Sequence, residues 1–193
     1  MKVLNYPHPV LKYKCKPINK IDQGLRDLVA EMFQIMYEDD GVGLAANQVG
    51  LPYRLFVMNP EGDPEKKEEE LVCINPVILK RSGKVEDNEG CLSFPGIHAD
   101  VLRAEAITFE SISLDGEIQR FDWKGHKARI VQHEIDHLNG IGFVDRLSAG
   151  AMLEIKQELE DLKTVFEGDR RLGFIPSDEE IARQIEELER LRC

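Results

Sequence analysis

The sequence has no long apolar run, no secretory signal and no internal repeat. No stretch of the 193 residues approaches the ~20 apolar residues that a membrane-spanning helix needs. The first residues, MKVLNYPHPVLKYKCKP, lack the apolar core and small-residue cleavage site of a signal peptide. They also lack the Arg- and Ser-rich composition of a transit peptide. These absences predict a cytoplasmic protein with no membrane partner.

Cysteines are few, and acidic residues outnumber cations. Cys15, Cys73, Cys91 and Cys193 form no CxxC pair, which argues against a disulfide framework in a cytoplasmic protein. Two of them, Cys15 and Cys73, are expected to be buried as small apolar residues. With 25 Lys and Arg against 36 Asp and Glu, the formal net charge is −11. Nucleic-acid binding requires clustered cations, so we expect no DNA partner.

Apolar periodicity and turn signals predict an α+β catalytic domain over residues 1–147. The expected elements are a helix over 23–38 capped by Asp22, strands over 54–58 and 71–80, a hairpin that turns at Asp115-Gly116, and a helix over 125–138 that ends at Asn139-Gly140. Polar segments over 59–70 and 81–90 are expected to be loops. Strands, a hairpin and one embedded helix are typical of an α+β fold.

Residues 148–193 differ and predict additional amphipathic helices. Ser177-Asp178-Glu179-Glu180 is a capping box that starts the last of them. Apolar residues recur at helical spacing at Met152, Ile155, Leu159, Leu162, Phe166, Ile181, Ile185, Leu188 and Leu191. Such stripes favour a helical hairpin that folds on itself or onto the catalytic domain. Self-association through a short coiled coil, which would make a homo-oligomer, and some other partner are the alternatives.

The stretch QHEIDHLNG, residues 132–140, carries a metal-binding pattern. Positions four apart lie one above the other on a helix, so His133 and His137 can offer two imidazole nitrogens to one ion. Glu134 is rotated by ~100° and can reach a water molecule rather than the ion. H-E-x-x-H therefore predicts two ligands and one general base. Chance occurrence of this pattern on an exposed helix is the alternative.

The third ligand is open on the pattern alone. Metzincins place a histidine six residues after the second one, where this chain has Phe143. Other zincins use a downstream glutamate, but Glu154, Glu158 and Glu160 lie in a pattern typical of a solvent-facing helix. Cys91, within EGCLSFPG, follows a polar turn. Burial as a small apolar residue therefore does not explain a cysteine at this position. A dication stabilises a thiolate, so Cys91 is the upstream candidate.

Three stretches together resemble the signature motifs of peptide deformylases. They are GVGLAANQ (41–48), EGCLS (89–93) and QHEIDH (132–137), in the family's order and at its customary spacing. The resemblance extends from about Tyr6-Pro7 to about Leu147, and the C-terminal segment shows no family counterpart from sequence. It implies antiparallel sheets around a central metal-binding helix. It also implies that Cys91 joins His133 and His137 in binding one metal ion per chain.

The resemblance implies removal of the formyl group from N-formylmethionine, with release of formate through a metal-bound hydroxide. Glu134 would act as general base and then acid. Gln48 and the backbone N–H of Leu92 would stabilise the oxyanion. We expect Fe2+ as the metal, with Zn2+, Ni2+ or Co2+ able to substitute. The partners would be formyl-Met peptides and nascent chains at the ribosome of a bacterial cell.

Substrate-binding residues follow from the same resemblance. They are Val42, Gly43, Gly90, His126 and Ile130. The GVG segment would pair with the bound peptide in β fashion, and Val42, Ile130 and the rim around His126 would form an apolar methionine pocket.

Three positions depart from the family's usual pattern, and the first is His8, where the family often has an acidic residue. His98 stands where bacterial members commonly have Arg. Arg129 stands where some members have an apolar pocket residue, so we expect its stem to line the pocket and its charge to reach solvent. A metallopeptidase and a non-enzymatic protein with a structural metal, acting through its helical tail, are the alternative functions.

Overall fold

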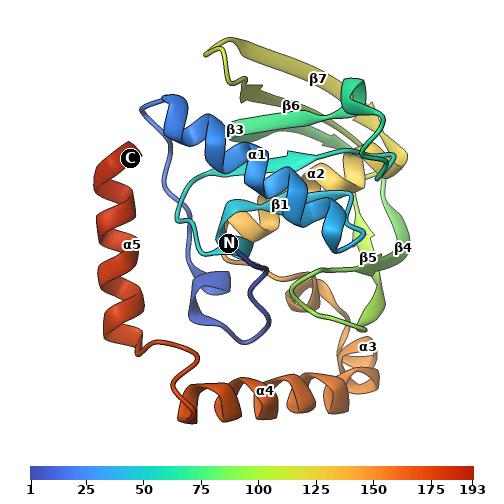
Figure 1. The fold of residues 1–193 in the computed structure, drawn as a ribbon. Helices are drawn as coiled ribbons and strands as arrows, with labels where there is room; N and C mark the ends of the chain where they lie inside the picture. The colour runs from blue at the N-terminus through green and yellow to red at the C-terminus, as the bar shows by residue number, and fades with distance from the viewer.

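The computed structural model describes residues 1–193, and at its centre a five-stranded antiparallel sheet packs against helix α2 (Figure 1). In the order in which they pair, its strands are β1 (Gly43–Ala45), β2 (Leu55–Met58), β3 (Leu71–Ser82), β6 (Ala106–Ile112) and β7 (Ile118–Lys124). A separate two-stranded sheet pairs β4 (Val85–Gly90) with β5 (His98–Arg103). The helices are α1 (Gln23–Glu38), α2 (Gly125–Leu138), α3 (Ala149–Glu154), α4 (Lys156–Arg171) and α5 (Asp178–Arg192). The architecture is α+β, as predicted.

Strand β2 is fully buried because helices cover both of its faces. Leu55 and Val57 belong to the core cluster that contains α1, whereas Phe56 and Met58 belong to the cluster that contains α2. Successive side chains of a strand point to opposite faces, so α1 and α2 lie on opposite sides of the sheet here. A strand covered on both faces is apolar throughout, which explains why the run LFVM shows no polar alternation.

The two helices predicted in the catalytic domain are confirmed. The Asp22 side chain accepts a hydrogen bond from the backbone N–H of Leu25 at 2.9 Å and caps α1. Helix α2 ends at the Asn139-Gly140 turn. Gly140 has a φ of 73°, and a Cβ there would lie 2.3 Å from the carbonyl oxygen of Lys12. Only glycine fits this turn, because both the backbone angle and the close approach exclude a side chain.

The loop predicted over residues 81–90 is wrong, since residues 85–90 form strand β4. Of its side chains only Glu89 is buried. An exposed strand has no apolar alternation for a sequence pattern to detect. The buried strand predicted over 71–80 is confirmed as a strand but leaves the core in its second half, where Val77 and Leu79 are 51% and 48% exposed.

Helices α3 and α4 pack beneath the loop that follows β4 (Figure 1). Ile155 and Leu159 are buried in one apolar cluster with Phe94 and Phe143. Cys91 packs against the edge of that cluster. The C-terminal segment is therefore in contact with the neighbourhood of the cysteine through apolar side chains.

Helix α5 runs along the side of the molecule (Figure 1). The Ser177 side chain accepts a hydrogen bond from the Glu180 N–H at 3.2 Å, which confirms the predicted start of this helix. Ile181 and Ile185 form a small buried cluster with Val10. The last turn also bonds the catalytic domain, because the Arg192 side chain donates to Asp22 at 3.1 Å. The domain boundary at residue 147 and self-association through these helices stay predictions.

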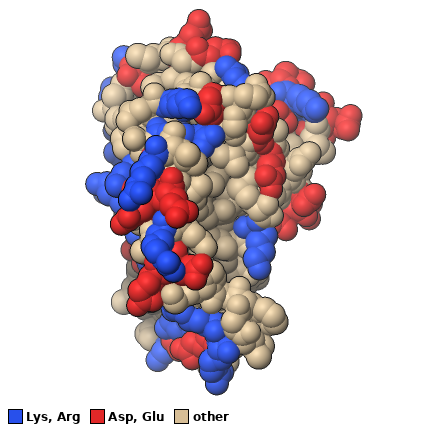
Figure 2. Space-filling model, turned by 60° about the vertical axis from the view of Figure 1, so that its left-hand side comes forward, with Lys and Arg blue, Asp and Glu red and all other residues tan.

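Charges of both signs are interspersed on the surface. On the face shown in Figure 2, Lys and Arg side chains lie among Asp and Glu side chains. Over the whole chain, Asp and Glu outnumber Lys and Arg by 36 to 25. None of the helices combines the length and the apolarity needed to cross a membrane.

Candidate metal centre

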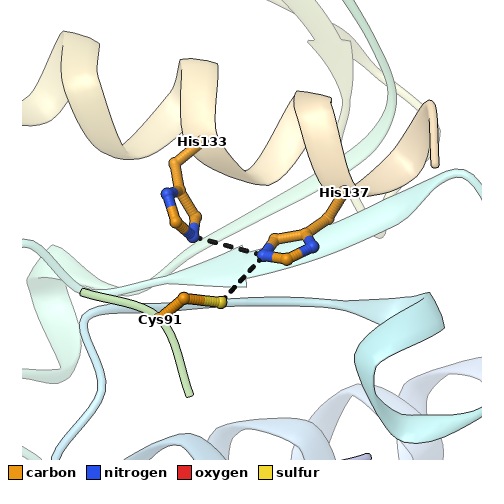
Figure 3. Close-up of side chains that lie close together, drawn as sticks. All are labelled: Cys91, His133 and His137. Carbon is orange, nitrogen blue, oxygen red and sulfur yellow. Dashed lines mark hydrogen bonds between the residues drawn. The ribbon is translucent and has the colours of Figure 1, made fainter. Parts of the chain in front are cut away.

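Three donor atoms converge where helix α2 faces the residue after β4 (Figure 3). The Cys91 sulfur lies 3.1 Å from Nε2 of His137, and that nitrogen lies 3.2 Å from Nε2 of His133. All three atoms lie within 4.8 Å of one another. The two histidines come from consecutive turns of α2 and the cysteine from a segment more than forty positions earlier in the chain. The structure thus brings together the three ligands expected from the resemblance.

The donor set fits a transition-metal ion. One thiolate and two neutral imidazoles suit zinc or iron, whereas Mg2+ and Ca2+ prefer oxygen. Nδ1 of His133 lies 3.0 Å from a carboxylate oxygen of Glu89, so this nitrogen carries the proton and Nε2 is free to bind an ion. A carboxylate behind a ligating histidine is the usual second layer of a metal site. Glu158, by contrast, is exposed on α4 and does not belong to this group of donor atoms.

Behind the ligands, Glu89 sits at the centre of a buried ionic network. Its carboxylate accepts hydrogen bonds from Arg103 at 2.8 Å and from Arg129 at 2.6 Å, besides His133. Burial would raise the pKa of the Glu89 carboxyl, but hydrogen bonds from His133 and Arg103 hold it well below its usual range. The charge of Arg129 was expected to reach solvent. That expectation is wrong, because its guanidinium pairs with Glu89 and the residue is buried.

Sequence reasoning did not assign a role to Glu89, Arg103 or Asp136. Arg103 donates to Asp136 at 2.7 Å, and its side chain is only 2% exposed. The one signal available in the sequence was that Glu89 is an acidic residue two places before Cys91. The partners of Glu89 come from β5 and α2, and no local sequence pattern connects these two elements to it.

Glu134 projects from α2 into the site beside strand β1. The residue is buried, and its Oε2 atom has no hydrogen-bond partner within the chain. A Cβ on Gly43 would lie 2.5 Å from Oε1 of Glu134, so the glycine allows this close approach. Burial raises the pKa of the Glu134 carboxyl to about 7, although the charges of His133 and Arg103 oppose the rise. A carboxyl group that titrates near neutral pH can both accept and donate a proton.

Gln48 presents its amide nitrogen to the same site from a short 3-10 helix, Ala46–Val49. Its oxygen accepts the backbone N–H of Ala45 at 2.8 Å, which fixes the orientation of the amide. Its nitrogen lies 3.6 Å from the Cys91 sulfur and 3.2 Å from the Ser93 hydroxyl. The backbone N–H of Leu92 makes no hydrogen bond within the chain. Two uncharged donors therefore flank the cysteine.

A cleft of about 890 Å³ opens onto these groups. Its lining includes every residue expected to contact substrate, namely Val42, Gly43, Gly90, His126 and Ile130. Ile130 is buried, whereas His126 is exposed at the rim. The His98 ring also lines the cleft and lies over Gly90, where a Cβ would come within 2.4 Å of it. His137 does not line this cleft, and it alone among the expected site residues borders a separate cavity of about 190 Å³.

Comparison with known proteins extends the resemblance over nearly the whole chain. The family model described as polypeptide deformylase matches residues 1–151. A peptide deformylase of Rhodopirellula baltica is 39% identical over 189 residues, which cover 98% of this chain and 94% of that protein. The chloroplastic/mitochondrial peptide deformylase 1B of Arabidopsis thaliana is 43% identical over 186 residues, covering 95% of this chain and 67% of that protein.

Solved structures agree with the sequence matches. A crystal structure of Arabidopsis thaliana peptide deformylase 1B superimposes with a TM-score of 0.84 at 41% identity, covering 92% of this chain and 97% of that one. The family model ends at residue 151, as the sequence led us to expect, but the matches to these individual relatives extend into the C-terminal helices. The three motifs, the fold and these matches together show that the chain belongs to the polypeptide deformylase family.

Proposed function

We propose that this chain removes the formyl group from N-formylmethionine at the start of nascent polypeptides and releases formate. One observation carries the proposal. Three metal-binding atoms lie within 4.8 Å of one another, and two of their residues, Cys91 and His133, line the cleft together with Glu134, whose Oε2 atom is unpartnered. The relatives named above are peptide deformylases, which supports the choice of substrate.

Cys91, His133 and His137 would hold one divalent ion per chain, and we propose Fe2+, with Zn2+, Ni2+ or Co2+ able to replace it. The ligands suit iron and zinc alike, so the choice of Fe2+ rests on the family. When bound, such an ion supplies Lewis-acid chemistry that activates water at neutral pH and polarises a carbonyl group.

Glu134 would move the proton during hydrolysis. Its Oε2 atom takes a proton from the attacking water while the water oxygen bonds to the formyl carbon. The same carboxyl group then gives that proton to the methionine nitrogen as the carbon–nitrogen bond breaks. Formic acid, which then loses its proton to give formate, and a free amino terminus result, and the Glu134 carboxylate is restored. A pKa of about 7 suits both halves of this cycle.

The developing oxyanion would be stabilised by two N–H donors. Gln48 offers its amide nitrogen, held in place by Ala45, and Leu92 offers a free backbone N–H. Donors fixed in advance need no reorganisation when charge develops on the carbonyl oxygen, so they lower the barrier selectively.

Strand β1 would bind the main chain of the peptide. It is an edge strand that pairs only with β2, so its other edge has no strand partner and an added strand could pair there beside Gly43. Val42 and Ile130 would form the apolar wall of the methionine pocket, with His126 at its rim. Main-chain pairing tolerates varied residues after methionine, which suits an enzyme that acts on many nascent chains.

We place the reaction in the cytoplasm, at the ribosome, although the named plant relative is chloroplastic or mitochondrial.

Replacing Gln48 by glutamate tests the oxyanion donor. The variant keeps the side-chain shape and an acceptor for the Ala45 N–H but removes the N–H donor and adds negative charge. We expect kcat for a formyl-Met peptide to fall by about 10²–10³-fold with metal content unchanged. Steady-state kinetics and metal analysis of the same preparation measure both. An unchanged kcat would remove Gln48 from this role.

The proposed function is tested by purifying the chain without oxygen, measuring bound metal and assaying formate release. A formyl-Met peptide is compared with the matching acetyl-Met peptide. We expect one Fe2+ per chain, formate from the first peptide and no reaction with the second. One tightly bound metal ion without formate release would instead favour a protein with a structural metal. Cleavage within the peptide would favour a metallopeptidase.

A further inference from the structure

The cysteine of the metal centre is carried by an element that does not belong to the main sheet. Strands β4 and β5 pair only with each other, and Cys91 follows β4 directly. Within the two strands only Glu89, Val101 and Arg103 are buried. Apart from the two-residue connections to β3 and to β6, side-chain contacts rather than a shared backbone ladder fix this hairpin, residues 85–103, relative to α2, which carries the two histidines (Figure 1).

Arg129 makes the contact that reaches both strands of the hairpin. Its Nη1 atom donates to Glu89 at 2.6 Å and to the carbonyl oxygen of Val101, on β5, at 2.9 Å. Its Nη2 atom donates to the carbonyl oxygen of Val85, on β4, at 3.0 Å. The planar guanidinium with its fixed fork of donors can hold three acceptors in one geometry. One side chain thereby ties both strands and the buried carboxylate to α2.

Arg103 connects the same two parts in the opposite direction, from the hairpin to α2, but it contacts only carboxylates. It extends from β5 to Glu89 and to Asp136 on α2. Arg129, in contrast, lies one helical turn before His133, on the same face of α2. It also shares with His133 the carboxylate of Glu89.

We infer that Arg129 is a positioning residue of the metal centre, setting the placement of Cys91 relative to His133 and His137 by clamping the β4–β5 hairpin onto α2. This inference rests on the proposed use of these three residues as metal ligands. Without Arg129, two strand carbonyls and one carboxylate oxygen lose a charged donor. The hairpin then docks less firmly, and the ligands are less well arranged for an ion. Outer residues of this kind typically contribute about 10–100-fold to metal affinity.

The test measures Zn2+ affinity, by competition with a chelator, in Arg129→Met, Arg129→Lys and the control Arg120→Met. Arg120 is exposed on β7 and pairs loosely with Glu110 at 3.6 Å. Amide hydrogen exchange of the metal-free proteins is followed in parallel. We expect Arg129→Met to bind Zn2+ about 10–100-fold more weakly. Amides of β4 and β5 should exchange faster in this variant, while those of β2, β3 and β6 stay as in the wild type.

The remaining variants make the outcome decisive. A lysine can reach one acceptor but not all three, so Arg129→Lys should fall between the wild type and Arg129→Met, and Arg120→Met should match the wild type. Wild-type Zn2+ affinity in Arg129→Met would overturn the inference, as would faster exchange spread evenly over both sheets. If the methionine variant does not fold, a lysine variant with wild-type affinity overturns it. Neither measurement uses a formylated peptide, so failure of the proposed activity would be seen separately.

Discussion

Replacing Glu134 by glutamine is expected to lower kcat for formate release by about 10²–10⁴-fold while the metal content stays unchanged. The carboxylate oxygen Oε2 is buried and unpartnered, so it is free to take the proton of a water molecule. An amide of the same shape cannot take that proton or return it to the leaving nitrogen. The change removes proton transfer and leaves Cys91, His133 and His137 in place. Steady-state kinetics and metal analysis of one preparation measure both quantities.

The matched control is Glu158→Gln, the same chemical change on the exposed face of α4. This variant should retain wild-type kcat and metal content. Retained activity in Glu134→Gln would remove Glu134 from the role of general base. Loss of metal together with activity would show instead that Glu134 supports the ion, which would contradict the separation of roles on α2.

Replacing Cys91 by serine is expected to weaken metal binding by more than the roughly 10–100-fold typical of outer residues, and formate release should be lost with the metal. A thiol beside a dication loses its proton and becomes a soft, charged ligand. A serine hydroxyl keeps its proton and bonds such ions weakly. The amount of metal that stays bound per chain after dialysis against a chelator ranks the metal affinities of the wild type and the variants.

Cys193→Ser provides the control, because this thiol is partly exposed at the end of α5 and lies outside the metal centre. The other two thiols are less suitable, because both are buried and their pKa values are raised to about 12 by burial. Unchanged metal content in Cys91→Ser would overturn the assignment of this cysteine as the third ligand.

Local signals in the sequence determined where many of the helices and strands of this protein begin and end. The cap at Asp22, the turn at Asp115-Gly116 and the stop at Asn139-Gly140 act within a few residues, so the elements they delimit could be predicted. Helical spacing alone placed the two histidines on one face of α2. The order of three short motifs then pointed to Cys91.

Tertiary structure decided what depends on partners distant in the chain. The strands β4 and β5 show no apolar alternation, because seven of their twelve residues are exposed and two of the three buried ones, Glu89 and Arg103, are charged. The burial of Arg129 depends on Glu89, forty residues earlier, and on two strand carbonyls that no pattern links to it. Spacing along a chain reports which face of an element is apolar, but a buried charge is stable only where folding supplies its partners. The three clustered donor residues could therefore be predicted from sequence, whereas the network that holds them in place required the fold.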